Sequence, residues 1–142
     1  MGHLKTLNKI IAIKEREIRQ QKQKIQQISS KINLIKEKIE MFKKQIKKYQ
    51  DFCTSSSPSQ MPFIVDSISH LKNQIENYLE AKSKIEKVLE KELDKLREIY
   101  AEKKAIETLK SKIELNISKQ EKIKERTILD EFASRKYISD SS

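Results

Sequence analysis

The sequence predicts an all-α fold, a long antiparallel two-helix coiled-coil hairpin, on the strength of three observations. The chain has one glycine and only two prolines, at positions 58 and 62, so a single break separates two long segments that lack helix breakers. Along both segments apolar residues recur at alternating steps of three and four. Charged residues make up 37% of the chain and apolar residues 36%, without tryptophan, which favours a thin seam between helices over a deep core.

We expect the first helix over about residues 4–52. Its apolar stripe is interrupted only by Lys14 and Gln21. A 3.5-residue repeat held over about seven heptads keeps one narrow face toward a partner helix and predicts a left-handed supercoil. The stripe consists of Leu4, Leu7, Ile11, Lys14, Ile18, Gln21, Ile25, Ile28, Ile32, Ile35, Ile39, Phe42, Ile46, Tyr49 and Cys53.

The segment CTSSSPSQMP, residues 53–62, is typical of a hairpin tip. Its serines compete for backbone hydrogen bonds, and each proline disfavours the helical conformation in the residue before it. Tyr49, Phe52 and Phe63 flank this tip, where they either pack in the seam or form a docking surface.

We expect the second helix over about residues 63–135, followed by a disordered tail over about residues 136–142. Steps of four through Leu89 and Leu93, and again through Leu109, Ile113 and Ile117, predict a longer local repeat and a less regular helix. Before that change the seam consists of Ile64, Ile68, Leu71, Ile75, Tyr78, Ile85 and Leu89.

The second helix is longer than the first. With the tip centred near residue 57, Leu4 lies level with about residue 111, and roughly the last 25 helical residues have no first-helix partner. This overhang still carries apolar residues and is either a docking surface or a frayed end. They are Ile113, Leu115, Ile117, Ile123, Ile128, Leu129 and Phe132.

Basic residues are concentrated in the first helix. Residues 1–52 hold 14 Lys and Arg against 5 Asp and Glu, whereas residues 53–142 hold 17 against 16. This excess favours an acidic protein surface, phosphates or anionic lipid as a partner. Nucleic acid is poorly supported, because no aromatic residues are interleaved with the basic ones. We therefore expect no nucleic-acid partner.

The sequence argues against catalysis and against a bound cofactor or metal. Two helices do not easily enclose a dry site, no glycine-rich loop could hold a phosphate, and neither His3 nor His70 has a second ligand at metal-binding spacing. A single cysteine, Cys53, cannot form an intramolecular disulfide, and no apolar run approaches the ~20 residues that span a bilayer. These features predict a soluble, intracellular, non-enzymatic chain.

The segment REIYAEKKAIETLKSKIELNISKQEKIKERTILDEFASRKY, residues 97–137, resembles FliJ, the small coiled-coil component of the flagellar type III export apparatus. Injectisome relatives of the YscO type share the likeness, which covers almost the whole chain. Its sharpest parts are the basic-rich stretch at residues 101–112 and the closing segment LDEFA at residues 129–133. The opening residues 4–19 are also similar to the start of the family.

The resemblance implies a central stalk that inserts into the hexameric export ATPase, supports its assembly and links it to the membrane export gate. It further implies a cytoplasmic protein, peripheral at the inner membrane through its partners, with export chaperones as further candidate partners and a monomer in isolation. A flagellar stalk, an injectisome stalk and a generic basic coiled-coil adaptor all remain open at this point.

Two sets of site residues follow from the resemblance. Gate binding near the tip is carried over by heptad position onto Phe42, Tyr49, Leu71 and Tyr78, although Lys38, Gln45 and Gln74 depart from the family pattern. ATPase binding at the end of the second helix falls on Ile128, Leu129, Asp130, Glu131 and Phe132.

Overall fold

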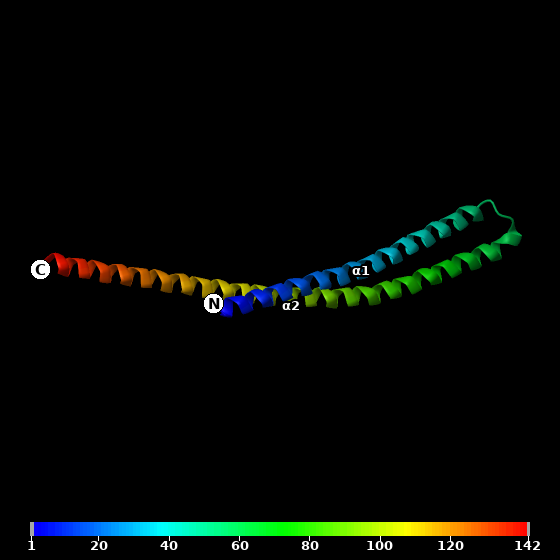
Figure 1. Ribbon diagram of the computed structural model, residues 1–142. Coiled ribbons are helices and arrows are strands. Elements are labelled where there is room, and N and C mark those ends of the chain that lie inside the picture. The colour runs from blue at the N-terminus through cyan, green and yellow to red at the C-terminus, as the bar shows by residue number, and fades with distance from the viewer. Residues whose placement is uncertain (1, 142) are drawn as a thin grey trace. The chain divides into compact units, whose positions relative to one another are not determined.

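The computed structural model describes residues 2–141, and describes side chains as far as residue 136. It contains a helix α1 at Gly2–Cys53, a short 3₁₀ helix η1 at Pro58–Gln60 and a helix α2 at Met61–Ser141 (Figure 1). The described residues contain no strand. The predicted all-α hairpin with two long helices packed against each other is confirmed.

The chain divides into two compact units. One comprises residues 18–97, with the tip and the adjoining parts of both helices. The other comprises Met1–Glu17 and Glu98–Ser142, and so joins the beginning of α1 to the later part of α2. In each unit a segment of α1 runs antiparallel to a segment of α2 (Figure 1).

The inward face of α1 is the stripe that the sequence predicts. Every member of that stripe, including Lys14 and Gln21, is buried or half-buried, while most of the other residues of α1 are exposed. The most enclosed members are Leu7, Ile18, Ile32 and Ile39, each 9% exposed or less. A continuous 52-residue helix without internal proline or glycine is thus held by one narrow apolar face.

The tip of the hairpin is shorter than the sequence suggests. α1 continues to Cys53 and α2 begins at Met61, so the turn and η1 occupy residues 54–60 rather than 53–62. The hydroxyls of Thr54 and Ser56 donate to the carbonyl oxygens of Asp51 and Phe52, at 2.7 and 2.6 Å, and so satisfy acceptors left free at the helix end. Pro62 is tolerated because the first turn of a helix needs no donor there.

In the unit of residues 18–97 the seam closes tightly beside the tip. Ile64 is 1% exposed and Leu71 is 8% exposed, and both face the inward side of α1. The predicted seam from Ile64 to Leu89 is buried or half-buried throughout. These side chains form the main apolar core of the unit.

The seam of α2 keeps the coiled-coil spacing further along than the sequence suggests. We expected steps of four through Leu93 and Leu109. Leu93 is half-buried beside Glu92, but Leu109 is 49% exposed. The inward positions that follow Glu92 are Leu96, Ile99, Lys103, Ile106, Lys110 and Ile113. The regular repeat persists because lysine stems can lie along an apolar seam while their ammonium groups reach water. The prediction of a lengthened repeat through Leu109 was therefore wrong.

The overhang of α2 belongs to the unit that contains Met1–Glu17. Ile117 is the last half-buried residue, and residues 118–136 are all exposed. The helix itself extends to Ser141, beyond the expected end near residue 135. The backbone is thus helical over residues 136–141, where a disordered tail over residues 136–142 was expected, and residue 142 lies outside the described part of the chain.

Candidate partner-binding surfaces

A groove lies between the two helices beside the tip. It has a volume of about 710 Å³ and an open mouth. Its walls are Gln45, Lys48, Tyr49 and Phe52 from α1, and Phe63, Asp66, Ser67, His70 and Leu71 from α2. The seam side chains end here, and the rings of Phe52 and Phe63 beside them are left without cover.

Phe52 and Phe63 are the most exposed apolar residues of this groove, at 54% and 69%. The sequence left open whether they pack or dock, and the structure leaves them uncovered. Both lie one position away from a seam residue, Cys53 or Ile64, so an extension of the heptad count to the flanking positions would have found them.

The four tip residues carried over from the family fall into two places. Tyr49 and Leu71 line the groove, but Leu71 is only 8% exposed and serves mainly the seam. Phe42 and Tyr78 pack against each other, with ring centroids 5.6 Å apart. The Lys38 ammonium lies 5.4 Å from the Tyr78 ring centroid and donates to the Tyr78 hydroxyl at 3.3 Å.

The predicted residues on the overhang are all exposed. Ile128, Leu129 and Phe132 are 64%, 67% and 67% exposed, and the charged Asp130 and Glu131 lie between them. Ile128 and Phe132 are four residues apart and therefore share a helix face, with Leu129 on its flank. This end of α2 presents a compact apolar surface bounded by charge.

The overhang does not continue the coiled-coil seam. Counting by three and four beyond Ile117 gives Gln120, Lys124, Thr127 and Glu131, all polar. A helix of the same kind as α1 would find no apolar stripe there. The overhang thus suits a partner that contacts a short apolar patch.

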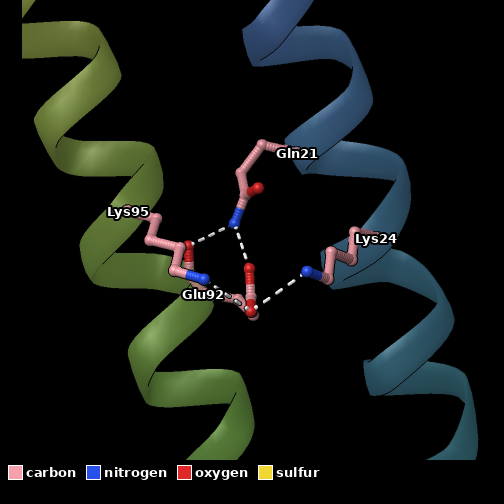
Figure 2. A network of polar contacts seen from close by, with 4 residues as sticks. All are labelled: Gln21, Lys24, Glu92 and Lys95. Atoms are coloured by element: carbon pink, nitrogen blue, oxygen red, sulfur yellow. Dashed lines mark hydrogen bonds and ion pairs between the residues drawn. The ribbon is translucent and has the colours of Figure 1, made fainter.

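A polar layer interrupts the seam in the unit of residues 18–97 (Figure 2). The Gln21 side-chain amide donates to the Glu92 carboxylate at 2.6 Å and to the Glu92 backbone carbonyl at 2.8 Å. Lys24 and Lys95 approach the other carboxylate oxygen at 3.2 and 3.4 Å. The hydrogen bond from Gln21, then those from Lys24 and Lys95, lower the pKa of Glu92 against the opposing effect of desolvation.

A second polar contact involves the other interruption of the α1 stripe. Lys14 donates to Glu102 across the two helices and to Glu17 along α1, at 3.4 Å for the latter. The hydrogen bond that Lys14 donates to Glu102 is the main reason that the pKa of Lys14 is raised, and desolvation partly opposes it. Each polar residue in the α1 stripe therefore meets an acidic residue of α2, which the sequence pattern of one helix could not reveal.

The side chains described here form no group of three or more His, Cys, Asp or Glu that could hold a metal ion. None of the helices in the described chain is long and apolar enough to cross a membrane. What the surfaces do offer is exposed aromatic and aliphatic side chains beside charges, which is chemistry for contacts with other proteins.

The fold and these surfaces define the class of the protein: an all-α coiled-coil hairpin with uncovered apolar patches at the tip and on the α2 overhang. The chain belongs to the FliJ family, since the family described as flagellar FliJ protein matches residues 3–142. Members of this family are non-enzymatic coiled-coil components of the flagellar export apparatus. No curated protein and no solved structure gives a significant match to the chain.

Proposed function

We propose that the chain is a stalk of the flagellar type III export apparatus that couples the hexameric export ATPase to the membrane export gate. The observation that carries this proposal is membership of the FliJ family over residues 3–142. Export chaperones are further candidate partners. In this proposal the protein is cytoplasmic and reaches the inner membrane through its partners.

The two uncovered surfaces support separate contacts with the two partners. The α2 overhang, with Ile128, Leu129 and Phe132 exposed, is the proposed ATPase contact, and Asp130 and Glu131 add charge to it. The groove beside the tip, with Tyr49, Phe52 and Phe63, is the proposed gate contact. Exposed aromatic side chains at the centre of a contact are the residue types that most often dominate binding energy.

The structure of the tip refines which residues we expect to touch the gate. Leu71 is buried in the seam and Phe42 and Tyr78 are engaged with each other, so Tyr49 and Phe63 are the better probes. A change at Leu71 would disturb packing and binding together. A change at Phe63 removes an exposed ring and leaves the seam intact.

The test of the proposal is a pair of binding measurements with the purified export ATPase and the cytoplasmic part of the gate. Removal of residues 126–142 should abolish ATPase retention but not gate binding. Tyr49→Ala and Phe63→Ala should each weaken gate binding by roughly tenfold or more, and leave ATPase retention and stimulation unchanged.

Leu79→Ala is the matched control, because Leu79 is an exposed apolar residue of α2, at 47%, that does not line the groove. It should bind both partners like the unaltered chain. The proposal fails if the full chain, shown to be helical by circular dichroism, retains neither the ATPase nor the gate.

A further inference from the structure

The two polar residues at the centre of Figure 2 occupy seam positions of opposite helices. Gln21 stands in the α1 stripe between Ile18 and Ile25, and Glu92 stands in the α2 seam between Leu89 and Leu96. Glu92 is the only charged residue among the buried ones that the structure describes, at 6% exposed. A carboxylate at such a position needs a specific partner in order to be tolerated.

Glu92 has hydrogen-bond or ion-pair partners for its whole carboxylate. Both carboxylate oxygens of Glu92 are engaged, one by Gln21 and the other by Lys24 and Lys95, and the Gln21 amide also holds the Glu92 carbonyl. Among the described residues no buried side-chain nitrogen or oxygen lacks a hydrogen-bond partner. The layer is therefore complete only when α1 and α2 meet in this orientation and at this level.

The rest of the α1 seam does little to distinguish α2 from another helix. From Ile25 to Ile46 it is isoleucine at every position but one, Phe42. Isoleucine at both core positions of a heptad favours association of several parallel helices. Such a stripe by itself specifies neither the direction nor the level of its partner helix.

We propose that the Gln21–Glu92 layer selects the intramolecular antiparallel pairing of α1 with α2 over self-association of chains. In a parallel, in-register pair of α2 helices two Glu92 carboxylates would face each other. In a parallel pair of α1 helices Gln21 would have no carboxylate to bind. A slip of α1 by one heptad would place Gln21 against Ile85 and leave its amide without a partner.

The layer selects one pairing because the alternative pairings leave its polar groups without partners. It does not add much to the stability of the hairpin. A polar residue at a core position of a coiled coil fixes register and oligomeric state at a cost in stability. Replacing both partners with leucine removes the discrimination and adds apolar contact. The change should therefore raise the unfolding temperature and weaken the preference for a single chain, and the two effects can be measured separately.

The experiment compares the double variant Q21L/E92L with the matched control Q27L/E90L, whose residues are of the same types but exposed and outside the seam. Sedimentation and thermal unfolding are measured over about a hundredfold range of concentration. Q21L/E92L should unfold at a higher temperature and pass largely from monomer to dimer or trimer. The unaltered chain and the control should stay monomeric.

A second variant keeps the test decisive if Q21L/E92L precipitates. Glu92→Lys places a third ammonium beside Lys24 and Lys95, so its unfolding temperature should fall, and an added Lys24→Glu should restore part of it. The inference is overturned if Q21L/E92L is monomeric at every concentration, if the unaltered chain is itself oligomeric, or if Glu92→Lys leaves the unfolding temperature unchanged.

Discussion

Glu92 is a buried residue whose side chain is stabilised in its charged form. Its 6% exposure would by itself favour the protonated form, yet the contacts from Gln21, Lys24 and Lys95 outweigh desolvation and lower the pKa. The folded chain therefore stabilises the carboxylate form of Glu92 more than the protonated form. The sign of the resulting pH dependence follows directly.

Replacing Glu92 with Gln should lower stability at neutral pH and have less effect in acid. Because the pKa of Glu92 is lower in the folded chain, its contribution is present above the ordinary pKa that it has in the unfolded chain and is lost as the pH falls through the folded value. The unfolding temperatures of the variant and the unaltered chain, measured by circular dichroism from neutral to acidic pH, should converge.

Glu90→Gln provides the comparison, because Glu90 is exposed and forms no ion pair with the residues that the structure describes. It should change the unfolding temperature little at any pH. A gap between Glu92→Gln and the unaltered chain that stays constant across the titration would contradict the role assigned to the Glu92 carboxylate.

At the scale of the element, the two parts of α2 differ in what keeps them helical. As far as Ile117 an inward face is covered by α1, whereas residues 118–136 are exposed throughout. An uncovered segment of this length is only marginally helical in water on its own propensity. The overhang therefore adds a surface to the molecule without adding to the core that holds the hairpin.

Removal of residues 118–142 should accordingly leave the unfolding temperature of the hairpin nearly unchanged, because the described side chains of this segment, at residues 118–136, are all exposed. Differential scanning calorimetry of the shortened chain checks this. Removal of residues 2–17 is the contrasting change: it deletes Leu7, which is 9% exposed, and uncovers Ile106 and Ile113, so it should lower the unfolding temperature. Equal effects of the two deletions would contradict the assignment.

At the scale of the whole molecule, charge and pairing both favour single chains. The formal net charge is +10, and residues 1–52 carry 14 Lys and Arg against 5 Asp and Glu, so like chains repel. Each seam residue of α1 already has its cover in α2 of the same chain. We therefore expect unfolding to be unimolecular.

The unfolding temperature of the full chain should not depend on protein concentration over about a hundredfold range, because mass action affects only associations between chains. Thermal scans followed by circular dichroism at low and high concentration measure this. A rise in unfolding temperature with concentration would show that the helices are paired between chains.

The sequence alone determined the face of each helix that turns inward near the tip, the place of the reversal and the existence of an overhang, because these depend on local spacing and on two prolines. It failed along the later α2 seam, where Leu109 was preferred to Lys110 as an inward residue and Glu92, beside the half-buried Leu93, was overlooked. Hydrophobicity points to leucine, but the supercoil holds its repeat and turns the lysine stem inward instead.

Only the tertiary structure decided which side chains meet. The pairing of Gln21 with Glu92 and of Lys14 with Glu102 depends on the relative level of two helices within each unit, which a periodic pattern does not encode. The exposure of Phe52 and Phe63 depends on how the side chains around the tip pack, which the periodic pattern does not give. Periodicity specifies a face, and the identity of the neighbour across the seam is set by register, a property of the folded pair.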